Sequence, residues 1–368
     1  MFSKNDKVSV RQVEILLILD LFSVSTLSFP RMAAEIANQD AWIAVIGATL
    51  LAFIYGYTIT SIVKRFPEDT FVEFSSKVLS KSVGIFLSLL FSIKLSITMA
   101  MELRIFGELV KQVLLPRTPI EIIMASMLLT CAYLVRKGYE CNARLGEILV
   151  FIIFIPLIVI LLFVLPDTDF SNLKPIFTTP FPRLLKGSYF LSFIYTPIEL
   201  ILLVGPLVND LKKARRVSFI AITFTGIINV ILTIITVSVL GSVGTKQQIW
   251  PVMTLMQIIE IPGAFVERQD ALMMIFWILI VFSFISTLMY FISFILTRIL
   301  KAEEHKFLVL PLVPIIYLIS LIPDNIVEAF NWIEFLRKYI RILFLLPIPL
   351  LLLIVAKIRK LGESIEEK

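Results

Sequence analysis

Ten apolar runs, each long enough to cross a lipid bilayer, dominate this sequence of 368 residues. A helix rises about 1.5 Å per residue, so roughly 17 to 25 apolar residues span the hydrocarbon core. Only 17% of the residues are charged, against roughly 25% in soluble proteins. We therefore expect one polytopic, all-α membrane domain over residues 1–368. The expected spans are 12–36, 41–63, 83–111, 119–135, 145–165, 187–209, 217–240, 267–299, 307–322 and 338–357.

Lysine and arginine gather in alternate connections between these runs. Most of the 34 basic residues fall on the same side as the N-terminus, so the positive-inside rule predicts that both termini are cytoplasmic, with 358–368 as a tail. The polar N-terminal segment has no cleavable signal pattern, and the first span is expected to direct insertion. Lipid head groups at the span ends explain the net charge of +6 better than nucleic acid does.

The first apolar run is interrupted by a serine-rich stretch that ends at Pro30. Proline removes a backbone donor and clashes with the carbonyl four residues earlier, which predicts an opening of the helix over about 25–29. Unwound backbone within a bilayer is tolerated only where it is buried in protein or lines a polar cavity. There its free N–H and C=O groups can hold a polar ligand.

Span 6 carries a matching interruption at Tyr195-Thr196-Pro197. Five spans per half place the two halves in opposite orientations, and breaks at corresponding positions are typical of an inverted repeat with a ligand site at the bilayer midplane. We expect repeat one over about 12–165 and repeat two over about 187–357. The alternative is a pair of proline kinks without a ligand.

Charged side chains within the spans need a partner or a task. Span 3 carries Lys94, Glu102, Arg104 and Glu108. Arg104 and Glu108 are four residues apart and are expected to pair, and a charge network that locks span 3 in place is one interpretation of the set. Lys94, with Thr98, is a candidate for the wall of the cavity. Glu199 has three possible roles: binding a substrate ammonium, carrying a proton, or pairing with a base of span 3.

Polar and small residues recur on three other spans at helical spacing. In span 8 they form a hydroxyl-bearing stripe that faces away from lipid, either as the wall of a site or as interhelical hydrogen bonds. Span 7 has a similar line, for which hydrogen bonding between helices is expected, and span 2 has a close-packing seam. The residues are Ser283, Ser286, Thr287, Tyr290, Ser293 and Thr297 in span 8, Thr225, Asn229, Thr233 and Thr236 in span 7, and Ala44, Ala48, Ala52 and Gly56 in span 2.

The remaining features indicate structure rather than chemistry. Cys131 is expected to be a buried thiol without a disulfide, and His305 a solvated loop residue. Residues 245–266 are expected to form short helices that cap the outer mouth, and 324–337 an interfacial helix, although either is also compatible with a plain connection. The sequence contains no metal-ligand cluster, nucleotide loop or nucleophile beside a base, which argues against an enzyme and against a cofactor.

Four motifs resemble the B subunits of bacterial endospore germinant receptors, a branch of the amino acid, polyamine and organocation transporter superfamily. The resemblance covers essentially the whole chain. The motifs are FPRMAAEIANQDAWIAV at 29–45, ELRIFGELVKQVLLPRTP at 102–119, IEL followed by the basic NDLKKARR within 198–216, and VERQDALMMIFWILIVF at 266–282.

This resemblance implies a leucine-transporter-type fold that binds a small-molecule nutrient, usually an amino acid, between spans 1, 3, 6 and 8. It also implies a spore inner membrane or cell membrane location and two partners, an A-type membrane subunit and a C-type lipoprotein subunit. With Glu199 included, the expected ligand-binding residues are Ser23, Val24, Ser25, Thr26, Lys94, Thr98, Thr196, Glu199, Phe284, Thr287 and Leu288. Relatives commonly carry Gly-x-Gly at the span 1 break, whereas the side chains of Ser23-Val24-Ser25 narrow the space beside the free N–H groups.

Three functions therefore remain open at this stage. The first is a nutrient sensor that signals germination to partner subunits by favouring one packing of the two repeats. The second is a proton- or sodium-coupled amino acid permease that uses the same cavity. The third is an ion-conducting subunit whose pore follows the polar faces of spans 3, 7 and 8.

Overall fold

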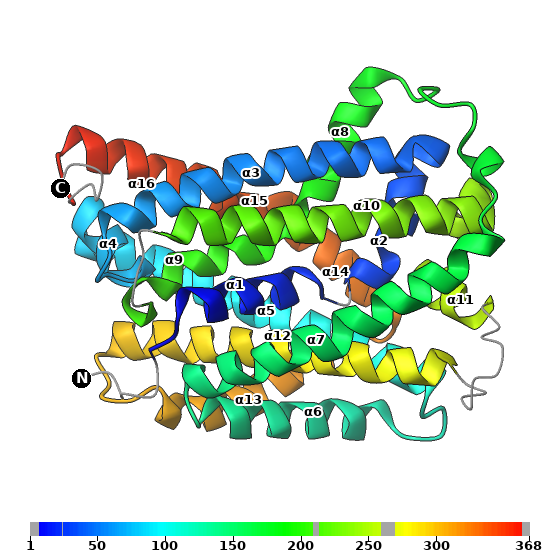
Figure 1. Cartoon of the computed structure of the whole chain (residues 1–368). Helices are drawn as coiled ribbons and strands as arrows, with labels where there is room; N and C mark the ends of the chain where they lie inside the picture. Colours follow the sequence, from blue (N-terminus) through cyan, green and yellow to red (C-terminus); the bar gives the residue numbers. More distant parts are fainter. Residues whose placement is uncertain (1–6, 24, 209–212, 259–268, 363–368) are drawn as a thin grey trace.

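The computed structural model describes residues 7–23, 25–208, 213–258 and 269–362. Over these residues the chain is a bundle of long helices that run roughly along one direction, with α1 (Val10–Leu21) between α10 (Ala214–Gln247) and α12 (Gln269–Leu300) (Figure 1). The next helix, α2 (Ser25–Ala37), packs against α10 and leads toward α3 (Ala41–Arg65). Seven helical stretches are long and apolar enough to cross a membrane, and α6 (Ile120–Val135) and α13 (Lys306–Ser320) are shorter apolar helices. The fold is that of an all-helical, multi-pass membrane protein.

Most of the expected spans correspond to single helices. The start of α1 and the end of the last helix, α16 (Pro347–Ile358), lie at the same end of the bundle (Figure 1). The other helices are α4 (Phe71–Val78), α5 (Lys81–Val113), α7 (Tyr139–Val164), α8 (Phe181–Leu191), α9 (Ile201–Val204), α11 (Pro251–Ile258), α14 (Ile326–Leu336) and α15 (Ile342–Leu345).

The first span is interrupted earlier than Pro30 predicts. α1 ends at Leu21, and Phe22 turns out of the helix with its N–H still bonded to the Ile18 and Leu19 carbonyls. Residues 25–29, expected to be open, instead form the beginning of α2. Pro30 lies inside α2, and its missing N–H removes one hydrogen bond to a carbonyl in the first turn of that helix. The chain leaves helical geometry before α2 begins. The expected opening over 25–29 is therefore wrong, and the interruption lies at 22–24, of which Val24 is outside the described residues.

The second interruption lies where the sequence predicts it. Residues Ser192–Leu200, here called the 3-10 segment, leave α-helical geometry between α8 and α9 and contain Pro197. Within this segment Thr196 donates its hydroxyl hydrogen bond to the carbonyl of Phe193. The backbone is wound more tightly than in an α-helix rather than unwound, as is common in short pieces at functional hinges.

The span 2 seam packs as its small residues predict. Ala44, Ala48 and Ala52 are fully buried on α3, which packs against α10 and α8. A Cβ atom added at Gly56 would collide with the Ser218 side chain of α10. Only residues without bulky side chains allow the helix backbones to approach this closely.

The turn between α2 and α3 holds the long connection that follows α7. Asp40 is buried, and its two carboxylate oxygens accept hydrogen bonds from the backbone N–H groups of Phe177 at 2.7 Å and Thr179 at 2.8 Å. The side chain of Gln39 donates to the carbonyl of Pro175 and to the hydroxyl of Thr178. These contacts give the Asn-Gln-Asp part of the first motif a structural role.

Three smaller expectations have different outcomes. The part of 245–266 that the structure describes contains α11, a short helix packed on α2, α10 and α12. The expected interfacial helix within 324–337 is α14, but it runs on into the last span and packs against α5 through Ala329 and Ile333. His305 is buried rather than solvated, because its ring packs edge-on against Tyr290 near the Val135 carbonyl.

Candidate functional site

A small cavity lies where the two interrupted helices meet α5 and α12. Its volume is about 20 Å³, enough for roughly one water molecule. α1 packs against both the 3-10 segment and α12, which brings Ser23 to the cavity wall. The lining residues are Ser23, Leu95, Thr98, Glu102, Phe193, Ile194, Thr196, Pro197, Glu199, Leu200, Phe284, Leu288 and Arg341.

The cavity collects six of the residues expected to bind ligand, from α5, the 3-10 segment, α12 and the span 1 break. These six are Ser23, Thr98, Thr196, Glu199, Phe284 and Leu288.

The other expected residues lie around the cavity or outside the description. Lys94 is bonded to Glu199, one of the lining residues. Thr287 accepts a hydrogen bond from Asn142 of α7 at 3.0 Å, and Thr26 is buried in the first turn of α2. Neither Val24 nor the side chain of Ser25 belongs to the described part of the chain.

Lys94 and Glu199 form a buried ion pair between α5 and the 3-10 segment. Their side chains are 1% and 2% exposed, and the Lys94 ammonium donates to Oε1 of Glu199. Of the three roles expected for Glu199, the structure shows the pairing with a base of span 3. The second carboxylate oxygen, Oε2, has no hydrogen-bond partner among the described residues. Because an unpaired charge in this environment costs several kcal/mol, the pair holds α5 and the 3-10 segment together.

Arg341 is a lining residue that the sequence analysis missed. It is buried at the end of the π-helical turn Arg337–Arg341, and its Nη2 makes a long hydrogen bond of 3.5 Å to the hydroxyl of Thr98. Glu102, on the same cavity wall, is the acid that interacts electrostatically with this guanidinium. The available signal was an arginine at the fourth residue of the expected span 338–357, but Arg337 and Lys338 just before it made it resemble one more basic residue of the membrane surface.

Asp20 is a second buried charge that the sequence analysis missed. It lies in the last turns of α1, 2% exposed, and interacts with the hydroxyl of Thr287. Asn142 donates to the same hydroxyl, so α1, α7 and α12 meet in a polar cluster. An acid directly after the apolar run 15–19 and before Leu21 and Phe22 was the available signal, because such residues are rare in membrane helices unless they serve a function.

The outer charges of span 3 belong to a different network. Arg104 and Glu108 form the expected pair at 2.8 Å, and Arg104 also donates to the carbonyl of Asp324 at 3.0 Å. These contacts fix α5 to the connection before α14. Neither side chain lines the cavity.

The hydroxyl stripe of α12 is buried along its length, as expected for a face turned away from lipid. Ser293 and Thr297 return their hydroxyl protons to carbonyls of their own helix, whereas Thr287 bonds to α7. On α10 the polar line is also buried, and the hydroxyl of Thr233 donates to the carbonyl of Asn229. Other hydroxyls of the two stripes are buried without a hydrogen-bond partner among the described residues, namely Ser283 and Ser286 on α12 and Thr225 and Thr236 on α10. The stripes therefore remain compatible with both packing and the wall of a site.

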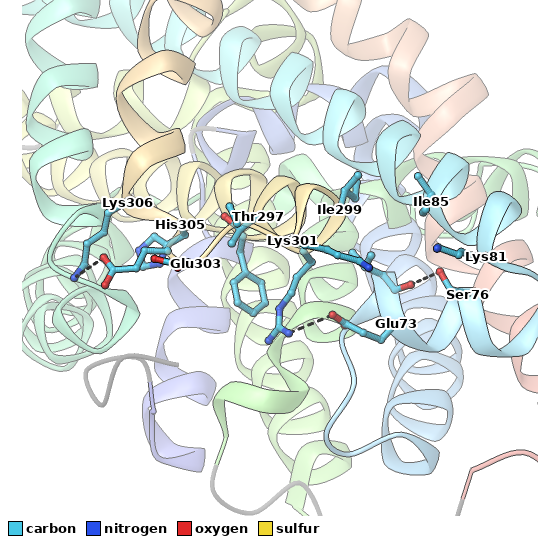
Figure 2. A pocket seen from close by; sticks show the side chains of 15 residues that line it. Glu73, Ser76, Lys81, Ile85, Thr297, Ile299, Lys301, Glu303, His305 and Lys306 are labelled. Atoms are coloured by element: carbon cyan, nitrogen blue, oxygen red, sulfur yellow. Dashed lines mark hydrogen bonds and ion pairs between the residues drawn. The ribbon is translucent and has the colours of Figure 1, made fainter. Parts of the chain in front are cut away.

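A larger, open cleft of about 460 Å³ lies elsewhere, between the end of α12, the start of α13, α4 and α5. Figure 2 shows that charged side chains line it, and two pairs neutralise each other: Arg298 with Glu73 at 3.3 Å and Lys306 with Glu304 at 3.6 Å. None of the residues expected to bind ligand lines this cleft. We therefore take the small cavity as the candidate site.

The comparisons with known proteins agree on one group. Residues 7–329 match a family model described as spore germination protein. Spore germination protein YndE of Bacillus subtilis is 28% identical over 99% of this chain and 100% of its own length. Spore germination protein KB of the same organism is 27% identical over 96% of this chain and 95% of its own. Spore germination protein GerLB of Bacillus cereus is 24% identical over 97% of this chain and 96% of its own length.

Proposed function

Because this chain belongs to the spore germination protein family, we propose that it is the nutrient-binding membrane subunit of a spore germinant receptor. The nutrient is an amino acid or a similarly small polar molecule. The observation that carries this proposal is the cavity between the span 1 break, the 3-10 segment, α5 and α12, with charged side chains on its wall. A bilayer-embedded protein keeps such side chains inside for a task.

The proposed architecture has ten spans in two inverted repeats, about 12–165 and 187–357, with both termini cytoplasmic. Two departures from α-helical geometry support it, one in the first span and one in the sixth. In this arrangement the ligand binds between the repeats, near the bilayer midplane.

Signalling follows from the size of the cavity. A space of about 20 Å³ is far smaller than an amino acid, so the surrounding helices must move apart when one binds. A ligand shifts a conformational equilibrium by its difference in affinity for the two states. The change to the more open packing is then transmitted to partner subunits of the A-type and C-type, which we place beside this chain in the spore inner membrane.

Ligand binding is tested by thermal unfolding of the purified full chain with amino acids, sugars and nucleosides. At least one compound is expected to raise the unfolding temperature, because a ligand stabilises the state that it binds. Thr196→Phe fills the cavity and should abolish the shift. Thr223→Phe is the matched control, because Thr223 is exposed on α10 and is not one of the lining residues. A panel without any stabilising compound would overturn the proposal.

A proton- or sodium-coupled amino acid permease is the second candidate. The observation that favours it is the buried cluster of Asp20, Asn142 and Thr287, since intramembrane acids often carry coupling ions. Uptake of a labelled amino acid into proteoliposomes containing this chain alone separates the two. A sensor binds without net flux, whereas a permease concentrates the amino acid along an imposed ion gradient.

A further inference from the structure

Two irregular helical turns face each other across the small cavity. The 3-10 segment (Ser192–Leu200) contacts the π-helical turn Arg337–Arg341 of the last span. A π-turn inserts one extra residue into a helix at a cost in stability, and such turns concentrate at functional sites. Here the turn ends at Arg341 and places its guanidinium on the cavity wall.

The two turns carry complementary, incompletely bonded charges. Arg341 is 5% exposed, and its Nε has no hydrogen-bond partner within the described part of the chain. The Oε2 atom of Glu199, which is 2% exposed, is likewise without one. Both residues line the same cavity. Buried polar atoms are normally satisfied, so one free donor and one free acceptor on a common wall indicate a ligand that supplies their partners.

We propose that Arg341 binds the carboxylate of the ligand and that Glu199 binds its ammonium group, so that the cavity selects a net-neutral zwitterion. This inference rests on the proposed function and assigns the groups that recognise the nutrient. A guanidinium binds a carboxylate side-on through Nε and one Nη. Nε of Arg341 has no acceptor among the described residues, and Nη2 makes only the long hydrogen bond of 3.5 Å to the hydroxyl of Thr98 there.

The charge balance of the wall leads to the same ligand class. Arg341, Glu102 and Glu199 line the cavity and Lys94 is bonded to Glu199, so two basic and two acidic side chains lie together and their formal charges balance. The site is neutral as it stands, so a zwitterion leaves it neutral. A ligand with a net charge would bury an uncompensated charge, which is strongly disfavoured in the interior.

Aliphatic and aromatic side chains line the cavity beside the hydroxyls of Ser23, Thr98 and Thr196, among them Leu95, Ile194, Leu200, Phe284 and Leu288. The Thr98 and Thr196 hydroxyls already donate to carbonyls of their own helices. The apolar part of the wall offers no hydrogen bonds to a polar side chain, and burying an unbonded polar group is unfavourable. An amino acid with a small apolar side chain is the member of the zwitterion class that fits.

The test compares amino acids with their amides on the full chain in nanodiscs. Each uncharged L-amino acid is titrated beside its amide, which keeps the ammonium group and lacks the carboxylate. For the tightest amino acid, the amide is expected to bind about 30-fold more weakly or worse, the cost of losing a buried charged hydrogen-bond partner. Arg341→Gln should weaken binding of the amino acid by the same factor and leave binding of the amide nearly unchanged. Arg341→Lys should restore part of the preference.

Arg104→Gln is the matched control, since Arg104 is a buried arginine of α5 that does not line the cavity, and it should leave the amide-to-acid ratio unchanged. Arg341→Gln combined with Glu102→Gln removes both charges and covers the case in which the single variant does not fold. Equal binding of acid and amide to the unaltered chain, or an unchanged ratio in Arg341→Gln, overturns this inference alone. If the unaltered chain binds none of the amino acids, the amino acid ligand of the proposed function fails as well.

Discussion

Replacing either member of the Lys94–Glu199 ion pair is expected to destabilise the protein far more than replacing both. The two side chains are 1% and 2% exposed, so solvent does not screen the charge that a single substitution leaves behind. Breaking a buried pair by removing one partner costs about 3–5 kcal/mol, whereas replacing both by apolar side chains is often neutral or stabilising by about 1–4 kcal/mol. The coupling free energy between the two sites should therefore be at least about 3 kcal/mol.

The two single variants are not expected to be equal. Glu199→Leu leaves the Lys94 ammonium facing the guanidinium of Arg341, which repels it. Lys94→Met leaves a carboxylate in a cavity wall that still contains Arg341. Glu199→Leu should therefore be the more destabilising substitution, and the double variant should recover most of the loss.

The assay is reversible unfolding of the purified chain in mixed micelles, with the free energy of unfolding measured for all four members of the cycle. The control cycle uses Arg31 and Glu35, whose side chains are 35% and 47% exposed. An exposed pair of this kind contributes less than about 1 kcal/mol. The reasoning is refuted if the loss in the free energy of unfolding of the double variant equals the sum of the losses of Lys94→Met and Glu199→Leu. Additive losses would mean that neither charge depends on the other.

Two further predictions concern the scaffold. Asp40→Ala removes the acceptor of the Phe177 and Thr179 amides. We expect a loss of about 3–6 kcal/mol in the free energy of unfolding, since each of these two hydrogen bonds to a charged group contributes about 1.5–3 kcal/mol, and faster proteolysis of the 165–180 connection. Unchanged cleavage of that connection would contradict the role given to Asp40. Gly56→Val places a side chain against Ser218 and should destabilise the protein by about 1–3 kcal/mol through overpacking. The measurement is the unfolding temperature, compared with that of Gly244→Val, where an added Cβ atom makes only ordinary contact with Leu240. Equal losses at the two glycines would exclude close α3–α10 packing as the cause.

The sequence predicted an all-helical membrane protein correctly, and most expected spans coincide with single helices, because the bilayer fixes the length of an apolar helix. The count of ten spans stays a prediction, since seven helical stretches of the described residues are long and apolar enough to cross a membrane. The sequence placed the second interruption correctly, because Thr196 and Pro197 lie within the 3-10 segment itself. It misplaced the first, because Pro30 shows only that a helix loses one hydrogen bond. Where the chain then opens depends on how α1 packs against α10, α12 and the 3-10 segment, which is a tertiary property.

The charged residues of the site show the same limit more sharply. Lys94 and Glu199 are visible in the sequence as charges within spans, and one of the three roles considered for Glu199 was its pairing with span 3. Arg341 was not predicted as a cavity residue, because hydropathy locates the end of a span only to within several residues. The π-turn that brings this side chain to the cavity leaves no signal in the sequence. Tyr290 and Val135 bury His305 in the same way, through contacts that no local pattern encodes.

The internal ion pair also bears on how a binding event becomes a signal. Lys94 and Glu199 already present an ammonium and a carboxylate to each other across the cavity wall. On the proposed function, the ammonium of a zwitterionic ligand bonds to the free Oε2 of Glu199 while Oε1 keeps Lys94, so ligand entry adds ion pairs without a change in net charge. The ligand favours the opened packing by the difference between its affinities for the opened and the closed packing. On the same proposal, a ligand lacking either charge leaves Oε2 of Glu199 or Nε of Arg341 without a partner and buries an uncompensated charge, so it should bind the opened packing weakly.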